Sequence, residues 1–454
     1  VMTGRIAVHG GYAWTSSADG RYSNGEGVAG PQRVWVQPPG TPAVGIAFLD
    51  AYAATADDTH LQAARAVGDA LIAGQLRSGG WGYSIEFEPA ARANIPYRTE
   101  PSGSRDKIAP TPKPGGWDVW RQRKYKANKT IIDDDTTPAA IRFLVKLDAA
   151  LDFKDERVHD AAAYALRSTL GAQYPVGAWS HNYDRFAIET PSHSHYPVLS
   201  ASYPDAWTRV SGNDFNGCYM INDRATPNMI ETMLLAANVY DDDRYRRSAI
   251  RGGEFLLRSQ MPDPQPAWAQ QYDRNMQPVW DRKFEPPAIT AGESQDVVRT
   301  LLVLYRETKD KRFLEPIPRA LAYLKSSLRP DGRLARYYEL KTNRPIYFTL
   351  DYQLTYDDRR MPDHYGFIVD SHLDELERDY NQIIADDVPP PTRRRDLEGE
   401  VRAALTAQHA DGAWLEPGFV RDGDGRKVTP PEGVVQSQTF INHVERLCQY
   451  LNAE

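Results

Sequence analysis

The amino-acid sequence predicts an all-α protein, an (α/α) toroid made of repeated helical hairpins with long functional loops at one end. Three features of the 454 residues support this prediction: an acidic turn that recurs inside each hairpin, a Gln-to-Trp turn that recurs after it, and long polar loops between the hairpins. A single hairpin buries little apolar surface, so the stack should fold as one domain over residues 1–454.

The acidic turn separates the two helices of a hairpin. In each copy an Asp precedes a large apolar residue by three positions, as Asp155 precedes Val158. Asp is a good helix N-cap, and the apolar residue then lies on the buried face of the following helix. The copies are Asp58 before Leu61, Asp155 before Val158, Asp242 before Tyr245 and Asp310 before Phe313. Apolar residues at three- and four-residue spacing predict the preceding helices at 42–56, 137–151, 226–239 and 292–307.

A second turn follows each hairpin, where a Gln is followed by a short loop with Gly or Pro and then by Trp. A fifth copy runs from Gln408 to Trp414. Five copies in phase favour a structural repeat over chance. The second helices should end at Gln75, Gln173, Gln260 and Leu328, and the first three turns lead to Trp81, Trp179 and Trp268. Residues 1–41 should be irregular, 386–394 an exposed connector, and helices at 395–408 and 433–451 should close the toroid within 386–454.

The composition limits the classes of function. The net charge of −7 and the pI of about 5.9 argue against a nucleic-acid-binding protein. An anionic substrate remains compatible, because a site needs only a local group of cations. Ten Trp and 25 Tyr suit either sugar faces or a large core. We expect a secreted or periplasmic monomer; whether Cys218 and Cys448 pair is left open.

Carboxylates precede two of the predicted helices. Asp133, Asp134 and Asp135 come just before the helix at 137, and three adjacent carboxylates repel one another unless a cation offsets them. Asp223 occupies the equivalent position before the helix at 226. Because all the long loops follow second helices, these residues should gather at one end of the toroid, where loops usually carry function.

Cationic and aromatic residues occur in the later loops. Arg282 and Lys283 follow Trp268 and Tyr272, and Arg336 begins a predicted hairpin that ends near Arg344. Arg binds carboxylates through two parallel hydrogen bonds. We therefore expect an anionic substrate to contact Arg336, Arg344, Lys283, Trp268, Tyr272, Trp81 and Trp179.

Several segments in order resemble the pectic acid lyases of polysaccharide lyase family 10. These are Thr130 to Leu144, Ile221 to Asp223, Trp268 to Ala288 and Thr342 to Tyr347, within residues 65 to 365. The resemblance implies an (α/α) toroid that cleaves polygalacturonate by calcium-assisted β-elimination. It also implies that Asp133 and Asp223 hold Ca²⁺ and substrate, that Arg282 is the base, and that Arg344 binds a substrate carboxylate. As one of the three adjacent carboxylates, Asp134 is expected to join them at the metal.

The sequence departs from the family pattern at several positions. Asp134 stands where the family usually has Asn, Ala140 where it has Glu, and Phe348 to Asp351 where it has Ser-Gly-Arg-Asp. The loops also carry His181, His193 and His195, which the family does not predict. A free guanidinium is a poor base, so the role of Arg282 would need neighbouring cations.

Three other functions are considered. One is lyase action on a different uronate polymer. Another is a glycoside hydrolase on the same fold, using Asp133 with Asp223 or Glu285 with Glu293 as the acid and base. A third is a carbohydrate-binding relative with a decayed site. The joint presence of Asp133, Asp223 and Arg282 argues against decay.

Overall fold

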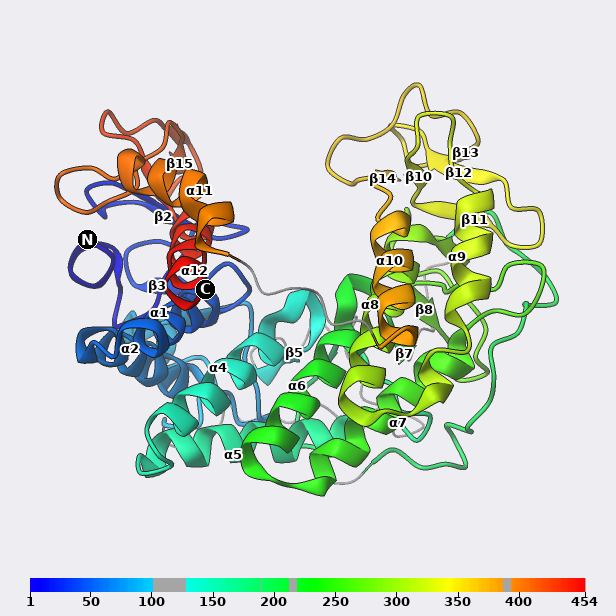
Figure 1. Ribbon diagram of the computed structural model, residues 1–454, viewed down its shortest axis with the longest axis horizontal. Helices are drawn as coiled ribbons and strands as arrows, with labels where there is room; N and C mark the ends of the chain where they lie inside the picture. The colour runs from blue at the N-terminus through cyan, green and yellow to red at the C-terminus, as the bar shows by residue number, and fades with distance from the viewer. Residues whose placement is uncertain (101–127, 189, 212–218, 387–392, 454) are drawn as a thin grey trace.

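The computed structural model describes residues 1–100, 128–188, 190–211, 219–386 and 393–453. Pairs of helices form an arc, which confirms the predicted (α/α) toroid class (Figure 1). The inner helices pack side by side in the order α12, α1, α4, α6, α8 and α10. Their bounds are α1 (Thr41–Thr55), α4 (Thr136–Ala150), α6 (Ala225–Tyr240), α8 (Ala291–Thr308), α10 (Leu373–Ile384) and α12 (Ser437–Asn452).

The outer helices start at the predicted acidic turns. The side chains of Asp155 and Asp242 accept hydrogen bonds from the backbone amides two residues later, at Arg157 and Arg244. In the first copy the cap is Asp57 rather than Asp58, because Asp57 accepts from Thr59. The outer helices are α2 (Asp58–Gly74), α5 (Glu156–Ala172), α7 (Asp243–Ser259), α9 (Ile317–Ser326) and α11 (Arg394–Ala407).

The Gln-to-Trp turn has a repeated physical cause. The Gln173 amide donates to the carbonyl oxygen of Gly177 at 2.8 Å, and also to that of Ser248 on the next outer helix at 3.0 Å. The indole of Trp179 then donates to the carbonyl of Thr169 at 2.8 Å. Gly177 has a φ of 106°, which favours glycine. Equivalent Trp-to-carbonyl bonds join Trp81 to Leu71, Trp268 to Leu256 and Trp414 to Ala404.

Short antiparallel strand pairs link neighbouring hairpins. A short strand precedes each of four inner helices. This strand pairs with a strand in the loop that follows the next outer helix along the chain. The backbone therefore ties the start of each of these inner helices to the loop that follows its own hairpin. The pairs are β3 (Arg33–Trp35) with β4 (Ser84–Glu86), β5 (Thr130–Ile131) with β6 (Asn182–Tyr183), β7 (Tyr219–Met220) with β8 (Gln271–Tyr272), and β9 (Ala288–Thr290) with β11 (Tyr337–Glu339).

The remaining elements are short. The predicted hairpin at 336–347 is confirmed, because β11 pairs with β12 (Pro345–Phe348), which pairs in turn with β13 (Leu354–Thr355). The others are β1 (Thr15–Ser17), β2 (Ser23–Asn24), β10 (Leu334–Ala335), β14 (Ile368–Val369), β15 (Val420–Arg421), β16 (Lys427–Val428), β17 (Val434–Gln436), α3 (Pro89–Arg92), the π-helix η1 (Met2–Ile6) and the 3₁₀ turn η5 (Lys311–Phe313).

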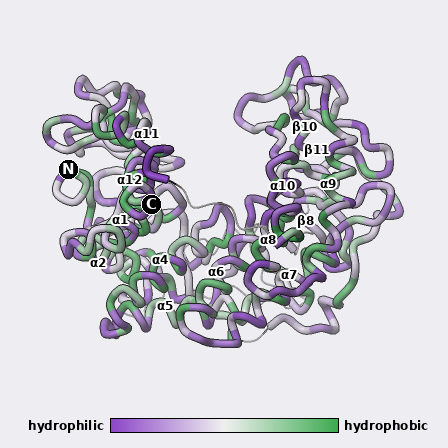
Figure 2. Tube along the Cα trace, viewed as in Figure 1, coloured by the Kyte–Doolittle hydropathy of each residue, from purple (hydrophilic) through white to green (hydrophobic). Residues whose placement is uncertain are grey.

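Three expectations about the elements were wrong in detail. Helix α10 was not predicted. Figure 2 shows a long hydrophilic stretch along it, and its few buried residues make too weak an apolar pattern to predict a helix. The helix predicted from 433 begins at Ser437, because Val434 and Val435 pair with Ser17 and Ser16 in a sheet. The fourth outer helix is interrupted near Pro316, so its first turn, η5, is separate from α9. Most of the predicted connector at 386–394 lies outside the described residues.

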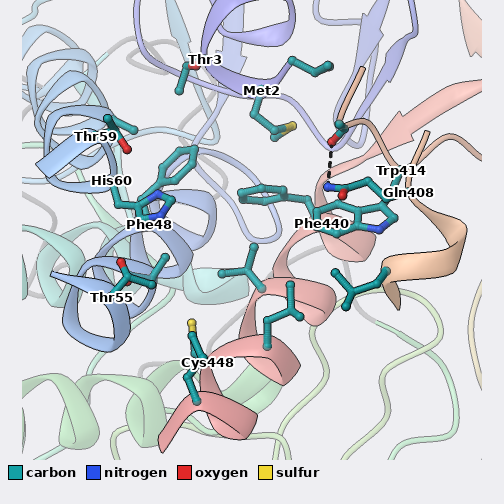
Figure 3. A pocket seen from close by; sticks show the side chains of 18 of the residues that line it. Met2, Thr3, Phe48, Thr55, Thr59, His60, Gln408, Trp414, Phe440 and Cys448 are labelled. Atoms are coloured by element: carbon teal, nitrogen blue, oxygen red, sulfur yellow. Dashed lines mark hydrogen bonds between the residues drawn. The ribbon is translucent and has the colours of Figure 1, made fainter. Parts of the chain in front are cut away.

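Helices α11 and α12 lie at one end of the arc, and α12 packs against α1 (Figure 1). A pocket of about 650 Å³ lies where these helices meet α1 and α2. Figure 3 shows that its lining includes Met2, Phe48, Trp414, Phe440 and Cys448. This apolar lining does not suit an anionic sugar. None of the helices among the described residues is long and apolar enough to cross a membrane.

Candidate functional site

Two equivalent turns present carboxylates at the starts of α4 and α6. Strand β5 leads into the 3₁₀ turn η3 (Asp133–Asp135), and β7 leads into η4 (Asn222–Arg224). The central residues Asp134 and Asp223 have φ values of 51° and 46°, in the left-handed region that Asp tolerates better than most residues. The two turns pack against each other, so the repeat brings both carboxylates to one place.

The ion pairs that follow these turns are repeated with opposite polarity. Asp135 pairs with Arg142 on α4, while Arg224, at the position of Asp135, pairs with Glu231 on α6 at 2.6 Å. Both pairs are separated by seven residues and are partly buried. The acid and the base have exchanged positions between the two turns, while the ion pair is kept. Asp135 is therefore a structural partner of Arg142. The remaining acids, Asp133, Asp134 and Asp223, make up the acidic cluster.

The acidic cluster is compact. One carboxylate oxygen from each of Asp133, Asp134 and Asp223 lies within 4.8 Å of the other two. Burial, and next the charge of Asp134, raise the pKa of Asp133 to about 8, although Arg282 acts in the opposite direction. Burial raises the pKa of Asp223 to about 8, and the other two cluster members add to the shift. Burial and Glu26 raise the pKa of Asp134.

These residues fit a divalent cation such as Ca²⁺. Carboxylate oxygens are the ligands that this ion prefers, and a cation would relieve the mutual repulsion that adds to the effect of burial on the pKa values. In the part of the chain that the structure describes, the buried Asp133 Oδ1 and Glu293 Oε2 have no hydrogen-bond partner. Tyr83 holds the other oxygen of Asp133, donating to Oδ2 at 3.3 Å.

Arg282 lies beside the acidic cluster in a two-pronged ion pair with Glu285. Its Nε donates to Glu285 Oε2 at 2.7 Å, and its Nη2 donates to Oε1. The side chain of Glu285 has no exposed surface, whereas that of Arg282 is 43% exposed. Burial acts to lower the pKa of Arg282, but the hydrogen bond and charge of Glu285 outweigh it, so the pKa is raised. Arg282 is therefore a cation in this arrangement.

Arg336 supplies a second cation from strand-end residues near β11. Its Nη1 lies 3.2 Å from Glu293 Oε1, and its Nε donates to the carbonyl of Gly366 at 2.6 Å. The Gln270 amide also donates to Glu293 Oε1 at 2.9 Å and to Asn222 Oδ1 at 3.0 Å. The predicted residue Arg336 thus reaches the same site as the acidic cluster.

The other predicted binding residues are distributed differently. Trp81, Trp179, Trp268 and Tyr272 have no exposed surface, and their polar atoms bond to the backbone, so they are core residues of the repeat. Lys283 and Arg344 lie over the rings of Tyr352 and Tyr356, at 3.5 and 3.4 Å from the ring centroids. A sugar could reach these last two residues without any change in the core.

The extra histidines separate into two groups. His181 is buried, its Nδ1 lies 4.0 Å from Asp281 Oδ2, and its carbonyl accepts from the amides of Ile132 and Asp133. It therefore supports the turn that carries the acidic cluster. His193 and His195 are exposed. Cys448 is buried as a free thiol, and Cys218 lies outside the described residues.

Some residues of the site were not predicted from the sequence. Tyr365, Tyr83 and Glu26 lie in loops without a recognisable motif. Only the folded chain brings Tyr83 and Glu26 to the acidic cluster and Tyr365 to Glu285. Gln270 lies inside the Trp-Ala-Gln-Gln-Tyr-Asp segment, which carried the resemblance, so that segment was a usable signal. Glu285 and Glu293 were considered only as an acid and base pair.

Comparison with known protein families finds a similarity in the central part of the chain. Residues 113–327 match the model of a family described as pectic acid lyase. The match confirms the predicted resemblance to this family over the central part of the chain. Among curated proteins, none matches the chain.

Solved structures add information about the fold. The chain is similar to a family 10 polysaccharide lyase from Cellvibrio cellulosa, with 17% identity, a TM-score of 0.47, and coverage of 76% of this chain and 96% of that one. A mutant of the family 10 lyase from the same organism, in complex with trigalacturonic acid, is 16% identical with a TM-score of 0.46, and the match covers 77% of this chain and 99% of that one. A D-mannose isomerase is 12% identical with a TM-score of 0.50, and the match covers 98% of this chain and 93% of that one. The TM-score of the isomerase supports a shared fold, and at 12% identity the likeness shows the fold alone.

Proposed function

We propose that this chain is a polysaccharide lyase that cleaves a uronate-containing polysaccharide by β-elimination, with polygalacturonate as the first candidate. The observation that carries the proposal is a compact acidic cluster beside Arg282 in a region that matches the pectic acid lyase family. We further propose that the protein acts as a secreted or periplasmic monomer on an anionic polysaccharide.

The chemistry of β-elimination explains this set of residues. The proton at C5 of a uronate becomes acidic when the charge of the neighbouring carboxylate is neutralised. A Ca²⁺ held by Asp133, Asp134 and Asp223 would supply that neutralisation when bound. Arg336 adds positive charge next to it and orients the anionic sugar. Arg344 is 3.4 Å from the Tyr356 ring on an exposed loop and could bind a more distant uronate.

Arg282 is the proposed base, and its surroundings act in both directions. Glu285 stabilises the charged guanidinium and so opposes loss of a proton. Arg336 lies over the same Tyr365 ring as Arg282, and a cation in the acidic cluster would add positive charge, so both favour the neutral form. If Arg282 is the base, Glu285→Gln should move the limb of the pH–rate profile that reports Arg282 to lower pH.

The test is the absorbance of unsaturated uronate after incubation with polygalacturonate and other uronate polymers, with Ca²⁺ or with a chelator. We expect absorbance that depends on Ca²⁺ and falls by about 10²-fold or more in Arg282→Ala and Asp223→Asn. Arg319→Ala, which removes an exposed ion pair with Asp263, is the matched control and should keep full activity. Absence of absorbance on every polymer would contradict the proposal.

A glycoside hydrolase is the second candidate. Asp133 and Asp223 have oxygens within 4.8 Å of each other, which is compatible with the spacing of a retaining acid and nucleophile pair. Their pKa values of about 8 would keep one of them protonated at neutral pH when no cation is bound. New reducing ends without unsaturated product would favour this candidate and remove the role of Arg282.

A further inference from the structure

Tyr365 projects into the site from the loop that connects β13 to β14. Its hydroxyl donates to Glu285 Oε1 at 3.1 Å, so the carboxylate that holds Arg282 also holds this phenol. The phenol oxygen accepts from the Gln270 amide at 3.2 Å and lies 3.2 Å from the hydroxyl of Tyr337. Tyr365 is half-buried, so it retains some exposed surface in the described structure.

Two guanidinium groups lie against the same ring. The Arg336 guanidinium carbon is 4.6 Å from the centroid of the Tyr365 ring, and that of Arg282 is 5.5 Å from it. Both positive charges, with the Gln270 amide, would stabilise negative charge on the phenol oxygen. Burial and the charges of Glu285 and Glu293 act in the opposite direction and raise the pKa of Tyr365, so the phenol keeps its proton until the reaction draws it away.

The proposed elimination needs a proton at a second position. When the C5–H and C4–O bonds break and the C4–C5 double bond forms, the proton from C5 goes to the base, and the leaving oxygen needs a proton from elsewhere. Among the described residues whose contacts place them at the acidic cluster, Arg282 is assigned as the base. Tyr83 donates instead to Asp133, a proposed ligand of the cation.

We propose that Tyr365 is the catalytic proton donor to the leaving glycosidic oxygen, held in place by Glu285. This inference rests on the proposed lyase function. The phenol O–H bond breaks as the C4–O bond breaks, the leaving oxygen becomes a hydroxyl, and the phenolate takes a proton from water before the next turnover. Burial also raises the pKa of Tyr365, which keeps the phenol protonated at neutral pH.

The test compares Tyr365→Phe with the wild type on whichever uronate polymer the wild type cleaves. We expect kcat to fall by about 10²-fold or more, whereas KM and the affinity for Tb³⁺, a luminescent substitute for Ca²⁺, should each change by less than about twofold and the melting temperature should stay the same. Tyr164→Phe is the matched control and should keep full activity, because this hydroxyl on α5 donates to the Arg77 carbonyl.

The outcomes separate the inference from the function on which it rests. If the wild type makes no unsaturated product, the proposed function fails and the inference fails with it. If the wild type is active and Tyr365→Phe is about equally active, only the inference is overturned. Loss of Tb³⁺ affinity or of thermal stability together with activity would show a structural role for Tyr365 and would also overturn it.

Discussion

Asp133 and Asp223 carry the clearest consequence at the scale of single residues. Their pKa values of about 8 exceed the ordinary value near 4, so the folded protein without a cation keeps protons that the unfolded chain releases. Its stability should therefore fall as the pH rises from about 4 to about 8, by up to about 1.4 kcal/mol per pH unit for each excess proton. A bound cation replaces those protons and removes this loss.

The prediction is that Ca²⁺ raises the melting temperature more at pH 8.5 than at pH 5. The measurement is thermal unfolding with Ca²⁺ or with a chelator at both pH values. Asp223→Asn removes one proposed ligand and should abolish most of the difference. An equal effect of Ca²⁺ at both pH values, or an unchanged effect in the variant, would show that the acidic cluster does not hold the ion.

The sequence predicted the acidic cluster but not Tyr365. Three adjacent Asp residues and a fourth in the equivalent turn predicted the acidic cluster, because like charges at one helix start require an explanation. Tyr365 gave no such signal, since it reaches Glu285 only through a contact between residues eighty positions apart. The tryptophans were misassigned to the substrate because an aromatic residue after a turn has the same pattern whether it faces a sugar or the core.

At the scale of elements, the Gln-to-Trp turn holds neighbouring hairpins together. Gln173 is almost fully buried, and besides its two donated bonds its Oε1 accepts from Ser248 and Arg251 at 2.8 and 2.7 Å. Gln408 occupies the same place in the last turn, but it is exposed, and its side-chain amide donates to the Gly412 carbonyl at 3.2 Å (Figure 3).

This difference predicts unequal effects of the same substitution. Gln173→Ala should lower the free energy of unfolding by about 2 kcal/mol or more, because several buried groups lose their partners. Gln408→Ala should cost less than about 1 kcal/mol, since water can replace its bond. Urea unfolding of both variants measures the values. Equal costs would mean that the turn does not act as a link between hairpins.

The helices with a strong local signal were the ones predicted correctly. Helices α1, α4, α6 and α8 begin and end within a few residues of the expected positions, because each is followed by a capping Asp. Helix α10 is followed by Asp386 and Asp387, but Pro stands three positions after each, so the pattern of the acidic turn is incomplete. The helix also has little buried surface, with Leu373 and Leu376 its only buried residues. Pairing of Val434 and Val435 with β1, more than four hundred residues away, could not be anticipated from local sequence.

At the scale of the whole molecule, the packing of α12 against α1 joins the two ends of the chain. The stack should therefore unfold as one unit, although the ribbon in Figure 1 shows α11 and α10 set apart. We predict coincident transitions by circular dichroism, which reports all helices, and by tryptophan fluorescence, which includes Trp414 in the last turn. An early fluorescence change that is abolished by Trp414→Phe would instead indicate separate unfolding of α11 and α12.

The central claim is that the chain cleaves a polysaccharide by elimination rather than by addition of water. Mass spectrometry of the oligosaccharides released from polygalacturonate, with Ca²⁺ present, tests this claim most directly. Elimination creates a new chain end that lacks the mass of one water molecule relative to the hydrolysis product, whereas hydrolysis in ¹⁸O-labelled water incorporates the label. We predict unsaturated ends without ¹⁸O. Saturated ends that carry ¹⁸O would contradict the account and establish a hydrolase on the same fold.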